Sequence, residues 1–249
     1  MALQVIGVVH RGHPDPSTTS EDDLGVRLVE SGNLAAAVRE LADDTELTDE
    51  DAAQHLDLLI LLLRGGPVLP IAFGTVSPDE DGVRAEILDP AAPELEERLA
   101  AVDGFVETRL EIYFDEAEAM SQVIAGDARL QQLAAEGRDP KSSLDTRIAL
   151  GEAVSSQLSD WRRDRAGALL PTLTGVVDNV AELESASPLQ QRWALLVRAE
   201  RLSELDENVG KLRAAVGKAS VEYVGPLPVY SFLGEPRVEP STNRSAWGW

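Results

Sequence analysis

Two proline-bearing apolar segments, far apart in the sequence, constrain the fold of this chain more than any other feature. Residues 67–76 read PVLPIAFGTV, and residues 221–232 read VEYVGPLPVYSF. Both are rich in strand-forming residues, but their prolines lack the N–H group that a sheet requires. Each strand must therefore lie at a sheet edge or end at a bulge. Because neither segment arranges an acid, a base or a nucleophile for catalysis, they favour a protein that works by binding.

Length and composition predict two domains with sizeable hydrophobic cores. The chain has 249 residues, of which 43% are hydrophobic, and domains usually contain about 100–150 residues. Its net charge of −22 disfavours nucleic acid, since binding to the phosphate backbone requires clustered Lys and Arg. The same charge disfavours an anionic membrane surface. The negative charge favours solubility, which would suit a protein that handles an aggregation-prone partner. It is explained equally well if the cytosolic proteins of the source cell are acidic in general.

The sequence predicts a soluble, intracellular protein. It contains no cysteine, which excludes disulfides and thiolate chemistry. No basic region precedes the apolar stretch at residues 3–10, so this stretch reads as a first strand and not as a signal peptide. The most apolar run, residues 56–63, contains Asp57 and is far shorter than the ~20 residues that span a bilayer.

The first 104 residues are predicted to form a small mixed sheet with helices. Thr48 and Asp51 have the spacing of a capping box, which begins a helix that extends through Leu63. This helix is apolar almost all round after Leu56, so it should be buried. The other predicted elements are a strand at 3–10, a hairpin of 26–30 and 34–41, a strand at 68–76 and a helix at 93–102.

Residues 105–234 are predicted to form a ferredoxin-like split βαβ unit with a helical enlargement after its first strand, which makes the whole chain α+β. The predicted elements are a strand at 105–114, helices at 115–136 and from Pro140 to Trp161, strands at 176–183 and 192–198, a helix at 203–216 and a strand at 220–232. For residues 176–183 a helix remains an alternative to the predicted strand. Residues 235–249 read as a disordered tail, in which Trp247 and Trp249 are either a docking motif or an unselected end.

The histidines do not form a convincing chemical site. His10 and His13 lie near Asp15, but third and fourth metal ligands are not identifiable, so a solvated loop is favoured over a metal site. His55 could act as a general base with Asp57, but a residue at i+2 faces elsewhere on a helix. A core or capping role for His55 is therefore favoured. No metal is predicted.

Nucleotide and carboxylate motifs also fail. The glycine–lysine run at residues 210–220 resembles a phosphate loop only superficially, because its glycine spacing is too long and Ala219 stands where Ser or Thr is needed. Carboxylate pairs such as Glu107 and Glu111 arise by chance among 44 acidic residues, so a solvated face is the expected reading. No cofactor is predicted. A small-molecule-binding enzyme built around His55 and Asp57 remains the alternative function.

Taken in order, these segments resemble the gas vesicle accessory proteins of the GvpF/GvpL type, over residues 3–233. The family pattern Val-Leu-Pro-x-x-Phe-Gly-Thr-Val matches residues 68–76, which follow the histidine-bearing helix. Its Gly-x-x-Glu strand is similar to residues 104–107, and its ending Gly-Pro-Trp-Pro-Pro-Tyr-Ser-Phe is similar to residues 225–232. The chain departs from this pattern at Leu227, Val229 and Ala72, where the family usually has Trp, Pro and Arg.

This resemblance implies a non-enzymatic assembly factor or minor vesicle component in the cytoplasm, associated with gas vesicles. Its implied partners are the major gas vesicle shell protein and other accessory proteins, whose aggregation it prevents or whose assembly it nucleates. The candidate contact or motif residues are Leu69, Pro70, Phe73, Gly74, Gly225, Pro226, Pro228, Tyr230 and Phe232. For Tyr230 and Phe232, a role in pinning the end of the chain across a domain interface is favoured over direct partner contact.

Overall fold

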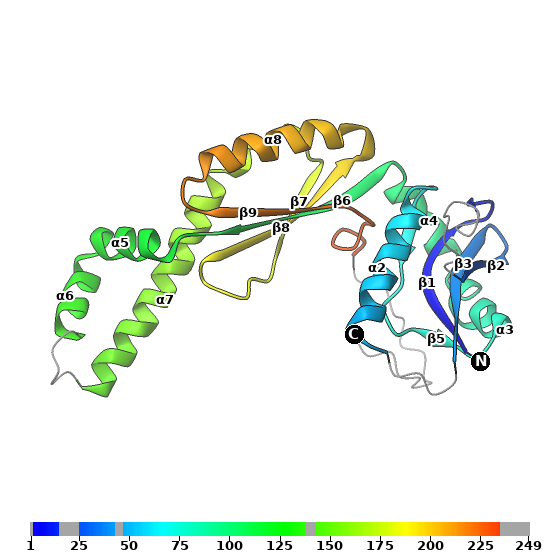
Figure 1. Cartoon of the computed structure of the whole chain (residues 1–249), viewed down its shortest axis with the longest axis horizontal. Coiled ribbons are helices and arrows are strands. Elements are labelled where there is room, and N and C mark those ends of the chain that lie inside the picture. The colour runs from blue at the N-terminus through cyan, green and yellow to red at the C-terminus, as the bar shows by residue number, and fades with distance from the viewer. Residues whose placement is uncertain (1, 15–24, 43–46, 138–142, 235–249) are drawn as a thin grey trace.

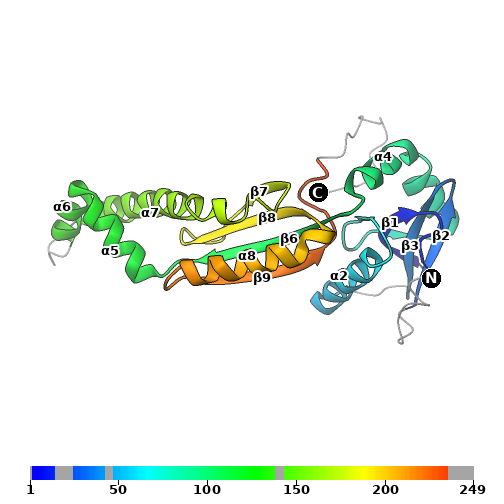
Figure 2. The same cartoon turned by 90° about the horizontal axis from the view of Figure 1, so that it is seen from above.

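The chain folds into an elongated α+β molecule with two antiparallel sheets, shown by a computed structural model that describes residues 2–14, 25–42, 47–137 and 143–234. The N-terminal sheet lies at one end, the C-terminal sheet occupies the middle, and a helical arm extends beyond it (Figures 1 and 2). The predicted α+β class is confirmed. The predicted tail at 235–249 lies outside the described residues.

The N-terminal sheet has the strand order β2-β3-β1-β4, with the short β5 also paired to β1. Its strands are β1 (Ala2–His10), β2 (Val26–Ser31), β3 (Leu34–Leu41), β4 (Val68–Pro70) and β5 (Val76–Ser77). The central strand β1 is buried on both faces: Val5 and Val8 pack on one side, and Ile6 and Val9 on the other. The predicted first strand and hairpin are confirmed.

Helices cover both faces of this sheet. Leu58, Leu59 and Leu62 of α2 (Asp49–Leu63) pack on one face. The opposite face is covered by a π-helical segment (Val83–Leu88), which follows the short α3 (Glu80–Gly82), and by α4 (Ala92–Val102). The sequence predicted α4 but neither of the two segments before it.

The capping box of α2 is confirmed, but the expected burial of this helix is wrong on one face. Thr48 N donates to Asp51 Oδ2 at 2.9 Å, and Asp51 N donates to Thr48 Oγ1 at 3.3 Å. Leu56 remains 38% exposed, because the N-terminal sheet covers only one side of the helix. Leu63, two turns further along the Leu56 side, packs against the core of the C-terminal sheet.

The predicted strand at 68–76 is wrong in its middle, because the chain leaves the sheet between β4 and β5. Thr75 N donates to Ala72 O at 3.1 Å to form a turn. Gly74 has a φ of 85°, in the left-handed region that glycine favours and a strand excludes. The turn is held at both ends, since Ile71 N donates to Ile6 O at 3.0 Å and Val5 N donates to Thr75 O at 2.9 Å.

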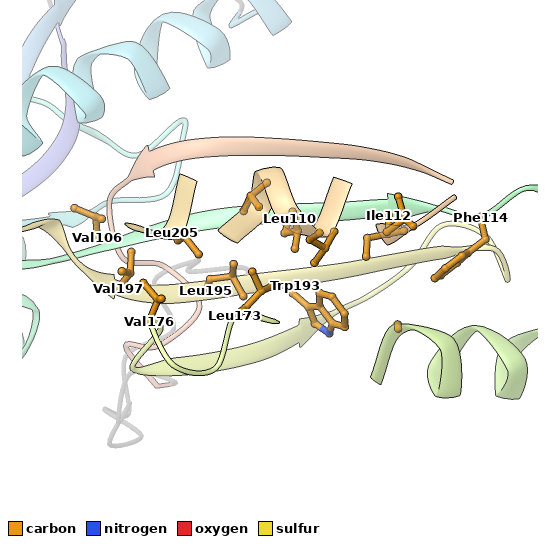
Figure 3. Close-up of a cluster of buried hydrophobic side chains, with 14 residues drawn as sticks. Val106, Leu110, Ile112, Phe114, Leu173, Val176, Trp193, Leu195, Val197 and Leu205 are labelled. Carbon is orange, nitrogen blue, oxygen red and sulfur yellow. The ribbon is translucent and has the colours of Figure 1, made fainter. Parts of the chain in front are cut away.

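The C-terminal sheet has the strand order β7-β8-β6-β9, with every neighbouring pair antiparallel. Its strands are β6 (Phe105–Tyr113), β7 (Asn179–Leu183), β8 (Gln190–Arg198) and β9 (Ser220–Leu227). Figure 3 shows Leu110 and Leu195 of this sheet in one core with Leu205 of α8 (Leu202–Ala215). The strand predicted at 220–232 is too long, and the one predicted at 176–183 is confirmed only from Asn179 onward.

The helical arm consists of α5 (Glu116–Gly126), α6 (Ala128–Gly137) and α7 (Leu144–Gly167). The single helix predicted at 115–136 is wrong, because the backbone is extended at Asp127, with φ −130° and ψ 112°. The Asp127 Oδ1 atom accepts from Arg129 N at 2.7 Å, so this residue starts a new helix. Pro140 lies outside the described residues, and α7 continues beyond the predicted end at Trp161.

Candidate functional site at the joint between the two sheets

The two proline-bearing segments meet where the N-terminal sheet joins the C-terminal sheet. Leu69 of β4 and Val229, which follows β9, belong to one buried cluster on the face of the N-terminal sheet that carries α4. Ile71 and Phe232 pack against the same cluster. In Figure 1 the segment after β9 turns down between the two sheets. Segments that are remote in sequence therefore form one joint.

A buried carboxylate fixes the second segment. Glu107 of β6 has no exposed surface, and its Oε2 accepts from Tyr230 N at 2.9 Å and from Ser231 N at 2.7 Å. Its Oε1 accepts from Ser231 Oγ at 2.9 Å and lies 3.7 Å from Arg109 Nε. The solvated-face interpretation of Glu107 is therefore wrong. The sequence signal for this role was the acid of the Gly-x-x-Glu strand, but the groups that donate hydrogen bonds to it lie more than 120 residues further along the chain.

Gly225 brings β9 into close contact with β6. A Cβ atom on Gly225 would lie 2.6 Å from Thr108 Cγ2 and 3.0 Å from Thr108 Cβ, closer than real side chains approach. The β6–β9 register is irregular between Glu107 and Arg109, opposite this glycine. The predicted end or bulge in a proline-bearing strand is therefore confirmed, since β9 stops at Leu227.

The first segment is held against α2 by His55. The buried His55 donates from Nε2 to Ile71 O at 3.1 Å, and its ring meets the Phe73 ring edge-on at 5.6 Å between centroids. Asp57, the suggested catalytic partner of His55, is exposed on another side of the helix. This arrangement gives His55 the core role that the sequence favoured.

The candidate residues divide into buried supports and exposed rings. Leu69 and Pro228 are buried, Pro70 and Phe232 are half-buried, and the exposed members are Gly74, Gly225, Pro226, Phe73 and Tyr230. Phe73 and Tyr230 are 40% and 38% exposed. Among the positions that depart from the family pattern, Leu227 and Val229 are buried and Ala72 is exposed. The joint therefore leaves two aromatic rings accessible.

The sequence missed a polar network on the face of the C-terminal sheet opposite α8. Glu111 Oε2 accepts from Gln190 Nε2 at 2.7 Å and from Tyr113 OH at 2.9 Å, while Oε1 accepts from Arg192 Nε at 2.9 Å. Burial opposes ionisation of Glu111, but these hydrogen bonds outweigh it and lower its pKa.

Nearer the joint, burial raises the pKa of Tyr230 to about 12, against the opposing charge of Arg109. Its ring is neutral at physiological pH.

His55 makes the stability of the chain pH-dependent. Burial lowers its pKa below the ordinary value of 6.5, against the opposing hydrogen bond to Ile71. The unfolded chain therefore takes up this proton first, so stability is full above about pH 6.5 and falls as the pH drops below it. We expect urea unfolding of the His55→Gln variant to depend less on pH between 6.5 and 5.5 than that of the parent. Equal slopes for the variant and the parent would contradict this expectation.

Two properties of the described residues bear on other classes of function. They contain no cluster of three or more His, Asp or Glu side chains that could hold a metal ion. None of the helices in the described ranges combines the length and the apolar character needed to cross a bilayer.

Comparison with known proteins places these features in a family. The model of the family described as gas vesicle synthesis protein GvpL/GvpF matches residues 2–234. Gas vesicle protein F of Streptomyces sp. (strain CB03234) is 28% identical, over 94% of this chain and 100% of that protein. Gas vesicle protein L1 of Halobacterium salinarum (strain ATCC 700922 / JCM 11081 / NRC-1) is 25% identical, over 87% of this chain and 83% of that protein.

Solved structures show the same fold. The crystal structure of GvpF from Anabaena sp. PCC7120 superposes with a TM-score of 0.77 at 18% identity, over 94% of this chain and 98% of that one. The crystal structure of GvpF from Microcystis aeruginosa gives a TM-score of 0.76 at 17% identity, over 94% and 99%.

Proposed function

Because the chain belongs to the GvpL/GvpF family of gas vesicle synthesis proteins, we propose that it is a non-enzymatic assembly factor or minor vesicle component. In this role it binds the major gas vesicle shell protein and other accessory proteins, and it keeps them from aggregating or nucleates their assembly. It works in the cytoplasm, in association with gas vesicles. Family membership carries the role in vesicle formation, and the joint supports the binding mechanism.

The exposed rings of the joint are the observation that carries this mechanism. The polar groups of the second segment are taken up by Glu107, while the rings of Phe73 and Tyr230 remain accessible. Rigidly held aromatic rings bind apolar surface with little loss of conformational entropy. Shell subunits that build a water-excluding wall present such surface before assembly. In this proposal the buried Leu69, Pro228 and Phe232 support the rings and do not touch the partner.

Catalysis is not favoured by the same geometry. An enzyme at this place would need His55 to reach a substrate or a second titratable group. Its Nε2 donates to the Ile71 carbonyl, and Phe73 lies against its ring. Through both contacts His55 holds the turn at residues 71–75 against α2. We therefore propose binding in place of turnover.

We further propose that residues 1–104 and 105–234 are two domains, the second of them a ferredoxin-like split βαβ unit. The strand order β7-β8-β6-β9, with antiparallel neighbours, supports this assignment. The packing of α8 and of the C-terminal part of α7 on one face of that sheet also supports it. The arm formed by α5, α6 and the start of α7 is then the helical enlargement of that unit.

Co-expression with the major shell protein tests the proposed function. We expect the shell protein to move from the pellet into a soluble complex that is captured with this chain, because the acidic chain covers its apolar surface. An unrelated acidic protein of similar net charge is the matched control, and it should leave the shell protein in the pellet. Insoluble shell protein with nothing captured on this chain would contradict the proposal.

A further inference from the structure

One helix of the molecule carries apolar side chains on a side that its own sheet does not use. Ala52, Leu56 and Ile60 follow each other at intervals of four along α2 and form a ridge on one flank of the helix, beside its buried face. Ala52 and Ile60 are half-buried, and Leu56 is exposed. Gln54 of the same helix accepts a hydrogen bond from Arg39 of β3 at 2.9 Å, which places β3 on the opposite flank. We name Ala52, Leu56, Ile60 and the exposed Phe73 the α2 ridge.

Phe73 extends this ridge beyond the helix. The sheet order puts β3 and the turn at 71–75 on opposite sides of β1, over which α2 lies. Phe73 reaches the helix from the β4 side, against His55, the residue before Leu56. A ridge with four-residue spacing fits the groove of a second helix in the commonest packing class. Its shape therefore suits a helix better than an extended strand.

The surroundings of the ridge are strongly acidic. Residues 1–104 contain 22 acidic side chains and six arginines, a net charge of −16. Asp49 and Asp57 of α2 are exposed in the neighbouring row of the helix, both on the same side of the ridge. Most of the arginines are already engaged by carboxylates of this half, in the pairs Arg11–Glu30, Arg27–Glu80, Arg39–Asp51, Arg84–Glu80 and Arg98–Glu94. A partner carrying Lys or Arg beside its apolar stripe is attracted here, and an acidic one is repelled.

We propose that the α2 ridge is the docking surface for a basic amphipathic helix of a partner protein. This inference rests on the proposed function and gives its partner a chemistry: apolar residues at i and i+4, flanked by Lys or Arg that face Asp49 and Asp57. A second copy of this chain is the less fitting occupant. Pairing two ridges would bring two acidic halves of net charge −16 together.

A model peptide tests the ridge without reference to any natural partner. The probe is an 18-residue helix with a leucine stripe at i and i+4 and flanking lysines, and its binding to the purified full chain is followed by fluorescence anisotropy. We expect Leu56→Asp to weaken binding about tenfold, because an apolar anchor is lost, although the change adds an attractive negative charge. Leu56→Gln should act alike. Ile148→Asp, at a 50% exposed position of α7, is the matched control and should leave binding unchanged.

Charge and self-association provide the second readout. We expect Asp57→Asn to weaken peptide binding modestly and to reduce its dependence on salt, because a screened attraction is removed. The inference is overturned if Leu56→Asp binds the peptide like the parent, or if a matching leucine–glutamate peptide binds equally well. It is also overturned if light scattering finds a dimer of the parent that Leu56→Asp abolishes, since the ridge would then be occupied by a second copy.

Co-expression separates this inference from the proposed function. Solubilisation of the shell protein by the parent and equally by Leu56→Asp would leave the proposed function standing and place its contact surface elsewhere. No solubilisation by the parent, together with peptide binding that depends on Leu56, would instead retain the ridge and reject the shell protein as its occupant. Circular dichroism of each variant checks that the chain is still folded, which is expected because Leu56 is exposed.

Discussion

Replacing Glu107 with alanine is expected to lower the free energy of unfolding by about 2–4 kcal/mol, one of the largest effects of a single change in this chain. The Glu107 carboxylate is buried and accepts hydrogen bonds from Tyr230 N, Ser231 N and Ser231 Oγ. Its removal leaves three donors without an acceptor and Arg109 without its partner. Urea unfolding, followed by circular dichroism, measures the change.

Further variants distinguish loss of the hydrogen bonds that Glu107 accepts from Tyr230 and Ser231, which we name the Glu107 clamp, from loss of one negative charge. Glu107→Gln keeps a carbonyl oxygen in place and should recover part of the stability. Glu207→Gln, at an exposed position of α8, is the control for removing one negative charge and should change stability by less than about 0.5 kcal/mol. If Glu107→Ala unfolds at the same urea concentration as the parent, the carboxylate does not hold the segment.

Replacing Gly225 with alanine is expected to destabilise the chain by about 1–3 kcal/mol, because the new methyl group has no space. Its Cβ would lie 2.6 Å from Thr108 Cγ2, where β9 approaches β6 closely. Either the strands separate or Thr108 moves, and both disturb the chain just before the Glu107 clamp. Thermal and urea unfolding of the variant measure the effect.

A double variant identifies the cause of this loss. Thr108→Ser removes the Cγ2 atom that the alanine would strike, so adding it to Gly225→Ala should restore part of the stability. Thr108→Ser alone should have a small effect by comparison. Gly126→Ala, at a position where a Cβ meets nothing within 4 Å, is the matched glycine control. The steric explanation fails if the double variant is no more stable than Gly225→Ala.

Local patterns predicted most of the secondary structure because their determinants lie within a few residues. The capping box of Thr48 and Asp51 located the start of α2 correctly, and the three-and-four spacing of leucines and valines located α8. The errors arose where a distant residue decides the local conformation. Asp127 interrupts a sequence that otherwise suits one helix, and its extended backbone lets Leu130 reach the buried cluster of the arm beside Leu158 of α7.

The sequence named the two segments that meet at the joint, but it did not predict how they are arranged there. The prolines of residues 221–232 predict that the strand ends or bulges, but they do not predict how the chain turns, because the carboxylate that holds the turn is Glu107 on another strand. Likewise, apolar residues all round α2 predicted complete burial, while the sheet covers one side only. A periodic pattern predicts which side chains are apolar enough to favour burial. It does not distinguish burial inside the chain from burial under a partner.

The place of Val229 in the core of the N-terminal sheet has a consequence for synthesis on the ribosome. The strands and helices of that sheet emerge first, yet their buried cluster contains Val229 and packs against Phe232, which are translated much later. Synthesis at about 5–20 residues per second separates the two by several seconds or more. During that interval the cluster is open at one side, so a nascent or truncated chain is a natural client for chaperones. The joint can close only after residues 229–232 have left the ribosome.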